Sequence, residues 1–338
     1  EYEQALPVIE SLEKRREAFV FILFFSTSGV HFAKKRCEKR SFHLAPPDCI
    51  WHWQKLFLSL QPTKTFVVRH ELWPCFLSTA KKFHSKLILI NASQNSGGNN
   101  NYFSLILKKN LLRQFDLICV IDKSDFSFFH RKLFLEERKI KITGDSKYDR
   151  VLSRLRSLNL EKDNCNPLSK RLRIIIGSAW QADVDLFLKA IRILKKKKPS
   201  FTFDLIIFFH EPSQLVHQRL MQEAQKMNLS SVIYKSLDQL KQSLKNENDL
   251  LNPTIQIKIV DQLGVLFEAY SLSQLAFVGG ASHYQVHNVL EPAAFGLPLA
   301  FGPFNKSSKE ASLLLKEGLA KEIKNADELC TWILSETQ

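Results

Sequence analysis

The chain has 338 residues, 45% of them hydrophobic and 24% charged, which excludes a disordered protein and leaves room for two domains with real cores. Its longest apolar run, residues 19–25, is too short to span a bilayer, which takes about 20 residues, so this run predicts a buried strand. The net charge of +14 favours anionic partners, but no nucleic-acid-binding signature occurs, and we expect no nucleic acid partner.

Short apolar segments alternate with helical patterns along the chain and predict parallel strands that are buried on both faces. A first series lies at residues 20–25, 65–68, 86–90, 117–121 and 139–143, and a second at 173–176, 204–209, 231–234, 257–260, 275–278 and 298–301. A polar stretch separates the two series. We therefore predict an α/β protein with two Rossmann-like domains that face each other across a cleft, at residues 1–152 and 172–338, joined by a linker at 153–171.

The spacing of the cysteines bears on metal sites and disulfide bonds. The six cysteines are scattered and include no Cys-x-x-Cys pair, which argues against zinc and against a disulfide framework and favours reduced thiols in a cytosolic protein. No signal peptide is visible. Because the first residue is glutamate rather than methionine, we expect a preceding segment that the sequence does not include.

Residues 279–303 (GGASHYQVHNVLEPAAFGLPLAFGP) are the most informative segment of the chain. A strand ends at Gly279-Gly280, and His287, Asn288 and Glu291 gather at the start of the helix that follows. Open parallel sheets bind ligands at the carboxyl ends of their strands, glycines let backbone approach a ligand, and helix amino ends attract anions. The segment predicts a ligand site in which the carboxylate suits ribose hydroxyls; the alternative is an ordinary connection with capping residues.

Other motifs of ligand chemistry are absent or weak. The sequence has no GxGxxG and no GxxxxGK[ST], which counts against dinucleotide and P-loop sites. Asp183 and Asp185 have the spacing of a metal-binding DxD motif, but they follow a strand and a turn at a helix start, where Asp commonly caps. We interpret them as caps and expect no metal site.

Several segments, in this order and spacing, resemble the 3-deoxy-D-manno-octulosonic acid (Kdo) transferases of lipopolysaccharide synthesis. The matching segments are 1–7 (EYEQALP), 27–29 (TSG), 71–74 (ELWP), 91–93 (NAS), 143–149 (TGDSKYD), 177–180 (GSAW), 210–212 (HEP) and 279–303. The last of these is the most specific. The two-domain architecture inferred above is the GT-B arrangement of many sugar-nucleotide transferases.

The resemblance implies a glycosyltransferase that moves Kdo from CMP-Kdo to the phosphorylated glucosamine disaccharide of a lipid A precursor, with inversion and without a metal or cofactor. It implies a cytoplasmic enzyme, peripheral on or anchored to the inner face of the inner membrane. It assigns Glu1 as catalytic base and Glu71 as a second catalytic carboxylate, in a first domain that binds the acceptor. The nucleotide-binding residues that it implies, all in the second domain, are Gly279, Gly280, His287, Asn288 and Glu291, with Ser178, His210 and Gly264 as contributors.

Three of these roles have simpler alternatives. Transfer needs positive groups at the departing phosphate, for which Lys147 and His210 are candidates, but Lys147 is equally well explained as a surface charge. Glu71 could be a helix cap, and Glu1 a first-turn acidic residue.

The amphipathic segment 102–115, which includes Lys108, suits an anionic membrane surface, although a packing helix would have the same pattern.

The chain departs from the family pattern at three positions. Arg69 replaces the first glutamate of the family's E-x-E-L-W-P motif, Ser93 replaces the arginine of its N-A-R motif, and Phe209 stands where proline or arginine is usual. Two other classes therefore stay open. One is a different GT-B nucleotide-sugar enzyme, such as a UDP-sugar transferase or epimerase. The other is a catalytically inactive, membrane-associated homologue.

Overall fold

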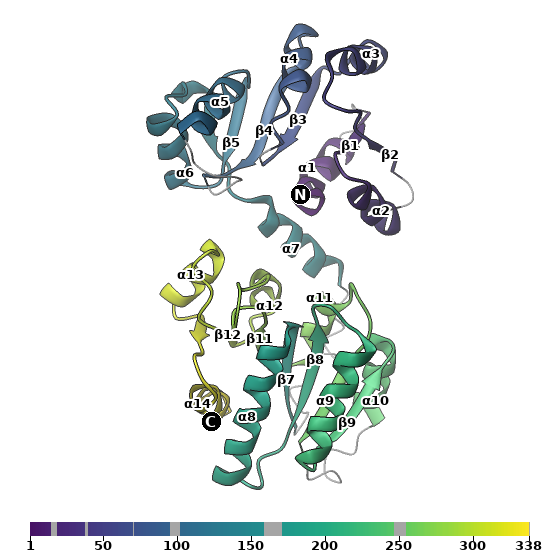
Figure 1. The fold of residues 1–338 in the computed structure, drawn as a ribbon, viewed down its shortest axis with the longest axis vertical. Helices are drawn as coiled ribbons and strands as arrows, with labels where there is room; N and C mark the ends of the chain where they lie inside the picture. Colours follow the sequence, from purple (N-terminus) through teal and green to yellow (C-terminus); the bar gives the residue numbers. More distant parts are fainter. Residues whose placement is uncertain are drawn as a thin grey trace. The chain divides into compact units, whose positions relative to one another are not determined.

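The structure is a computed structural model that describes residues 1–14, 19–37, 40–69, 71–94, 102–158, 171–246 and 255–337. It divides into two compact units, Glu1–Arg150 and Val151–Gln338, each built on parallel β-structure (Figure 1). In the described part of the chain, no helix has both the length and the apolar character needed to cross a bilayer.

The first unit contains a four-stranded parallel sheet in the order β3-β4-β5-β6 and a separate parallel pair, β1-β2. Its strands are β1 (Ile22–Phe24), β2 (Phe42–Leu44), β3 (Lys64–Val68), β4 (Lys86–Ala92), β5 (Leu117–Val120) and β6 (Ile140–Ile142). Its helices are α1 (Tyr2–Lys14), α2 (Thr27–Arg36), α3 (Ile50–Leu60), α4 (Pro74–Lys82), α5 (Tyr102–Leu112), α6 (Lys123–Ser127), the short turns η1 (Phe128–Lys132) and η2 (Glu137–Lys139), and the start of α7 (Ser146–Ser157).

Helices cover both faces of the four-stranded sheet. On one face, α3, α4 and α5 bury Trp53, Leu77 and Leu112 against the strands. On the other face, Val8 of α1 packs against Ile88 of β4. The inner strand β4 is therefore buried on both sides, which explains why Leu87–Ile90 form a continuous apolar run rather than an alternating one.

The second unit contains a seven-stranded parallel sheet in the order β13-β12-β11-β7-β8-β10-β9. Its strands are β7 (Leu172–Ala179), β8 (Phe203–Phe209), β9 (Ser230–Tyr234), β10 (Gln256–Val260), β11 (Leu275–Val278), β12 (Leu299–Phe301) and β13 (Ala320–Glu322). Its helices are α8 (Gln181–Lys197), α9 (Gln214–Lys226), α10 (Leu237–Asn246), α11 (Leu266–Ala269), η3 (Tyr270–Leu272), α12 (Leu290–Ala294), α13 (Lys309–Lys316) and α14 (Ala326–Ser335).

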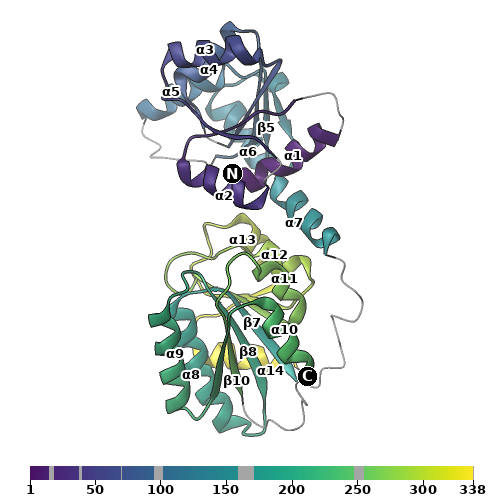
Figure 2. The same ribbon diagram turned by 90° about the vertical axis from the view of Figure 1, so that its right-hand side faces the viewer.

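Both faces of this larger sheet are also covered. Helices α8, α9 and α14 pack on one face, and α10, α11 and α13 pack on the other; Figure 2 shows α8 and α9 on one side of the sheet and α10 on the other. Every residue of β8 and β10 is buried, including Asp204 and Lys258. Their charged atoms lie 3.8 Å apart, and Arg171 donates to Asp204 at 2.6 Å, so these buried charges are paired.

The structure confirms the prediction of an α/β protein with two Rossmann-like units, and each predicted strand overlaps an observed one. The prediction missed β2 and β13, whose three residues each, FHL and AKE, are too short to form a pattern. The predicted linker 153–171 begins within α7, since residues 153–157 are helical and Leu155 packs beside Phe267. The remaining linker residues 159–170 lie outside the described residues.

Candidate active site

The carboxyl edge of the seven-stranded sheet gathers the residues predicted to bind a nucleotide. Strands β11, β7, β8 and β10 are neighbours in that order and run parallel, so the residues at their ends meet along one edge. In chain order these are Ser178 at the end of β7, His210 after β8, Gly264 after β10, and the segment from Gly279 to Glu291 after β11. Ser178 has a φ of +54° where β7 ends in an irregular register.

Gly279 and Gly280 are required by the packing of the protein against itself. A β-carbon on Gly279 would lie 2.4 Å from the carbonyl oxygen of Ser178. Gly280 has a φ of +92°, and a β-carbon there would lie 2.3 Å from the carbonyl oxygen of Gln285. We expected these glycines to let a ligand approach the backbone. In the structure they form a tight turn that has no room for any side chain.

Asp183 fastens this turn to helix α8. The residue is fully buried, and its Oδ2 accepts hydrogen bonds from the backbone N–H groups of Trp180 and Gly280, both at 2.9 Å. Asp185 accepts a hydrogen bond from Gln181 Nε2 at 2.8 Å. The interpretation of Asp183 as a helix cap is therefore confirmed. Within the described ranges, no three His, Cys, Asp or Glu side chains cluster as metal ligands do.

Three imidazoles and an indole form a stacked cluster beside the turn. His210 stacks on His287 with ring centroids 4.3 Å apart, and Trp180 stacks on His210 with centroids 5.0 Å apart. The Trp180 indole donates to His287 Nε2 at 2.9 Å, and His283 packs against the indole. Burial and the nearby His210 lower the pKa of His287; His283 adds to this effect and Asp183 opposes it. The neutral form of His287 is therefore favoured.

Asn288 and Glu291 start helix α12. Asn288 Oδ1 accepts a hydrogen bond from the Leu290 backbone at 3.1 Å. Glu291 Oε1 accepts a hydrogen bond from Arg154 Nη1 at 2.9 Å, and the guanidinium lies 4.1 Å from the centroid of the Phe267 ring. We expected this helix amino end to attract an anion, but α12 has five residues and one of its N–H groups is taken by Asn288. The carboxylate of Glu291 is thus ionically paired within the second unit.

Glu1 lies at the start of α1 in the first unit and is exposed. Its neighbour Tyr2 is buried against Phe24 and Phe42, with ring centroids 5.6 Å and 5.5 Å away. The first turn of α1 is therefore anchored at the β1-β2 pair, and this anchor holds Glu1 near the end of β1.

Glu71 is held by a tryptophan and is not the cap of the next helix. Its Oε2 accepts a hydrogen bond from the Trp73 indole at 2.7 Å, and Trp73 stacks on Phe25 with centroids 4.7 Å apart. The first turn of α4 is instead capped by Asp48, whose carboxylate accepts from two of its backbone N–H groups at 3.0 Å and 3.1 Å. The capping alternative for Glu71 was therefore wrong.

Two of the predicted residues have less definite surroundings. Lys147 lies in the first turn of α7, within the first unit, and its ammonium is 3.8 Å from Asp145 Oδ2. Gly264 has a φ of +85°, is exposed, and has nothing within 4 Å of where a β-carbon would lie. It therefore shapes a loop at the sheet edge without touching the cluster around His287.

The amphipathic segment 102–115 divides into two parts. Leu112 and Phe115 belong to the core of the first unit. Ile106 and Leu107 are 42% and 58% exposed, while Lys108 is half-buried and burial lowers its pKa. The packing alternative is therefore correct for the carboxyl-terminal end of the segment, whereas its middle, at residues 106 and 107, offers an exposed apolar surface.

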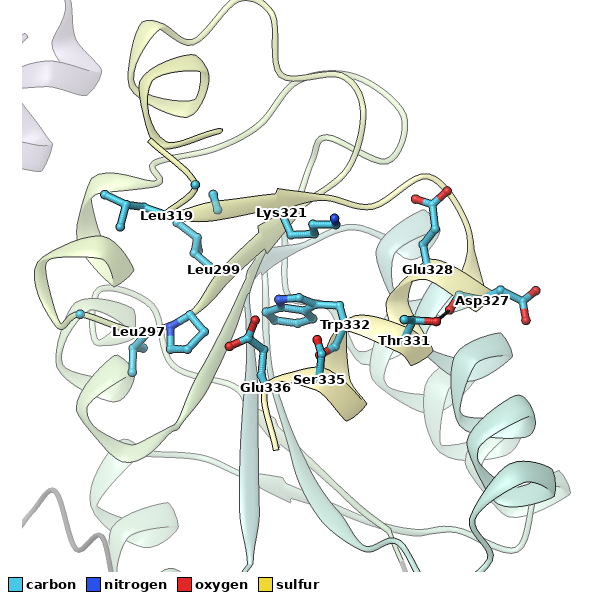
Figure 3. Close-up of a pocket in the computed structure, with 14 residues that line it drawn as sticks. Leu297, Leu299, Leu319, Lys321, Asp327, Glu328, Thr331, Trp332, Ser335 and Glu336 are labelled. Carbon is cyan, nitrogen blue, oxygen red and sulfur yellow. Dashed lines mark hydrogen bonds between the residues drawn. The ribbon is translucent and has the colours of Figure 1, made fainter. Parts of the chain in front are cut away.

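A wide cavity of about 720 Å³ lies elsewhere, at the amino ends of β12 and β13 and beside α14. Figure 3 shows Trp332 of α14 between Leu299 and Thr331 on its wall, with Lys321 on β13 above it. No residue predicted to bind substrate lines this cavity. The cavity is at the amino ends of the strands, whereas His287 is at their carboxyl ends. Parallel sheets bind ligands at the carboxyl ends of their strands, so the cluster around His287 is the better candidate site.

Comparison with known proteins identifies the family. Residues 1–150 match the family model described as 3-deoxy-D-manno-octulosonic-acid transferase (kdotransferase). A 3-deoxy-D-manno-octulosonic acid transferase of Aquifex aeolicus is 25% identical over 334 residues, which cover 98% of this chain and 81% of the relative. The first 150 residues therefore carry the Kdo transferase domain, and relatives that match nearly the whole chain are Kdo transferases. The chain is a glycosyltransferase, as the sequence resemblance implied.

Solved structures agree on the fold. A UDP-GlcNAc 2-epimerase from Neisseria meningitidis has a TM-score of 0.63 at 13% identity, over 98% of this chain and 87% of that one. Acinetobacter baumannii MurG has a TM-score of 0.57 at 13% identity, over 100% and 87%. At this identity the likeness concerns the fold alone. It confirms the GT-B arrangement of two Rossmann-like domains.

The sequence analysis did not assign a role to two residues that contact the predicted site. Trp180 was visible only as the last residue of the GSAW segment, and its position at the end of a strand next to a polar cluster was the available signal. Arg154 fell in the predicted linker, where nothing in the sequence connects it with Glu291, 137 residues away.

Proposed function

We propose that this enzyme transfers Kdo from CMP-Kdo to the phosphorylated glucosamine disaccharide of a lipid A precursor, with inversion at the anomeric carbon and without a metal. The second unit binds CMP-Kdo and the first binds the acceptor. The observation that carries this proposal is the polar cluster at the carboxyl edge of the seven-stranded sheet, in a chain whose first 150 residues carry the Kdo transferase domain. That edge is where parallel sheets bind nucleotides.

On the donor side, Glu291 accepts hydrogen bonds from the ribose hydroxyls, since an ionised carboxylate is purely an acceptor. Its ion pair with Arg154 holds its orientation. His210, His287 and Asn288 extend from the same edge toward the phosphate and the sugar, and the turn at Gly279-Gly280 packs closely against His287. Ser178 and Gly264 complete the loops around the nucleotide.

On the acceptor side, Glu1 removes the proton of the acceptor hydroxyl as its oxygen bonds to the anomeric carbon of Kdo. The bond from that carbon to the phosphate oxygen breaks, and its electron pair leaves with CMP. One such displacement inverts the anomeric carbon. Glu71, oriented by Trp73, positions the acceptor, and Lys147 supplies positive charge to a substrate phosphate.

The decisive experiment measures turnover with CMP-Kdo and a tetraacylated, bisphosphorylated glucosamine disaccharide. We expect the mass of one or more Kdo residues to be added to the acceptor and CMP to be released, equally with and without EDTA. Absence of product and of CMP release would contradict the proposed function. Activity that EDTA abolishes and Mg²⁺ restores would contradict only the claim of metal independence.

The two other classes predict different results. A UDP-sugar transferase or epimerase of the same fold should be stabilised by UDP in a thermal-shift assay, whereas we expect CMP to raise the melting temperature more than UDP does. A catalytically inactive homologue should bind CMP yet release none from CMP-Kdo. The departures at Arg69 and Ser93 favour testing this second outcome; Arg69 has a φ of +59°, and Ser93 is buried.

We also propose that the first unit rests on an anionic membrane surface, on the cytoplasmic face of the inner membrane. Ile106 and Leu107 are exposed on α5, next to Lys109, a combination that suits an interfacial helix. Ile106→Asp with Leu107→Asp should weaken co-sedimentation with phosphatidylglycerol vesicles, and added salt should weaken that of the parent. Binding that neither change affects would contradict this contact.

A further inference from the structure

Trp180 controls which nitrogen of His287 carries a proton. Its indole nitrogen lies 2.9 Å from His287 Nε2 in a hydrogen bond, and the two ring planes are parallel to within 2°. An indole nitrogen can only donate. His287 Nε2 must therefore accept, and the proton of the neutral imidazole is on Nδ1.

The same ring is held from one side by the glycine turn. The position that a β-carbon of Gly280 would occupy is 2.8 Å from Cδ2 and 2.9 Å from Nε2 of His287. Cδ2 and Nε2 are therefore the ring atoms closest to the turn. Since Nε2 also accepts from the indole, Nδ1 is the nitrogen that we infer to be left for a ligand.

The surroundings of His287 mostly oppose a positive charge. The groups that face it are His210, stacked at 4.3 Å, His283, the Trp180 indole and the buried carboxylate of Asp183. Protonation of Nε2 would set its N–H against the indole N–H, in addition to the unfavourable effects of burial and of the two imidazoles. Among these groups only Asp183 favours the cation, and its Oδ2 already accepts two backbone hydrogen bonds.

We propose that Trp180 is a positioning residue that fixes His287 as the neutral, Nδ1-protonated tautomer, so that His287 gives the donor nucleotide one hydrogen bond without a positive charge. The identity of that nucleotide rests on the function proposed above, whereas the tautomer does not. It follows that His287 does not protonate the departing CMP, because a neutral imidazole is a very weak acid. The charge that develops on the phosphate must be stabilised by other groups.

The test is nuclear magnetic resonance of protein labelled with ¹⁵N-histidine, in which two-bond proton–nitrogen correlations distinguish the two tautomers and the cation. The His287 signals are assigned by their loss in His287→Gln. At pH 7 we expect a protonated Nδ1 and an unprotonated Nε2. Trp180→Phe keeps a ring to stack on His210 but removes the donor, so His287 should become a mixture of tautomers with a raised pKa. Trp332→Phe makes the same chemical change on α14 of the same unit and should leave the His287 signals unchanged.

Turnover provides a second readout. In Trp180→Phe the acid limb of kcat/KM against pH should move to higher pH, and it should not move in Trp332→Phe. A purely structural role for Trp180 would lower stability or turnover without moving this limb. The parent protein alone decides the tautomer: a protonated Nε2 or an imidazolium at pH 7 overturns the proposal, as does an unchanged tautomer in a folded Trp180→Phe. Because the spectra need no substrate, failure of Kdo transfer would not affect this result.

Discussion

Replacing Glu291 with alanine tests two roles of its carboxylate. One is the ion pair with Arg154 within the protein, and the other is the proposed contact with the nucleotide. The variant removes the carboxylate that accepts from Arg154 at 2.9 Å, where the two side chains are 19% and 25% exposed. A hydrogen bond to a charged group contributes about 1.5–3 kcal/mol, and partial exposure places this pair near or below the lower figure. If Glu291 also binds ribose, a second contribution of about 1.5–3 kcal/mol is lost on binding, which weakens CMP roughly tenfold to a hundredfold.

Arg154→Ala is the matched control, because it breaks the same ion pair and leaves the carboxylate in place. Urea unfolding should show a comparable loss of stability in both single variants, and the double variant should lose less than their sum. Isothermal titration with CMP should show a much larger loss of affinity for Glu291→Ala than for Arg154→Ala. Equal losses would mean that Glu291 acts only by supporting the local fold, and an unchanged affinity in Glu291→Ala would refute ribose binding.

Three further predictions follow from the geometry. Gly280→Ala places a β-carbon at a positive φ and against the Gln285 carbonyl, and should lower the free energy of unfolding in urea by roughly 2–4 kcal/mol. Gly264→Ala has a similar φ but open space around the β-carbon, and should lower it by about 1 kcal/mol. Equal losses in the two variants would refute the overlap. Because the folded-state pKa of His287 is lowered, the unfolded chain binds more protons just below pH 6.5. The stability that neutral His287 contributes is therefore present above that pH and is lost as the pH falls below it toward the folded-state pKa. His287→Gln should flatten the stability profile just below pH 6.5, and an unchanged slope would count against this. Glu1→Gln should reduce turnover at least ~100-fold with CMP affinity intact, and near-parental turnover would exclude Glu1 as the base.

The strands of this protein were predictable because parallel strands buried on both faces must be apolar at every position. β8 satisfies this condition over seven consecutive residues, and its only polar member, Asp204, is paired with Arg171 and Lys258. β2 and β13 were not predictable because strands of three residues have no room for periodicity, and each lies at an edge of its sheet, where one side needs no partner strand.

The location of the candidate site was predictable for a related reason. A polar cluster that directly follows a buried strand must lie at the end of that strand, so His210 and Glu291 could be assigned to one edge without coordinates. The pairing of their side chains was not predictable. Trp180 meets His287 across 107 residues of sequence, because the sheet order places β7 beside β11. Arg154 meets Glu291 across 137 residues, because the end of α7 belongs to the second unit and packs in its core beside Phe267 and Leu290.

These long-range pairs hold the side chains of the cluster in place before a ligand binds. Asp183 is fixed by two backbone N–H groups, His287 by an indole, Asn288 by the start of α12 and Glu291 by a guanidinium. A side chain that must be immobilised by its ligand costs about 0.5–1.5 kcal/mol of affinity. Since folding already orders these four groups, the edge is largely pre-organised before a ligand binds. Under the proposed function, the energy of the contacts with CMP can therefore serve to orient the anomeric carbon, which is what a single displacement requires.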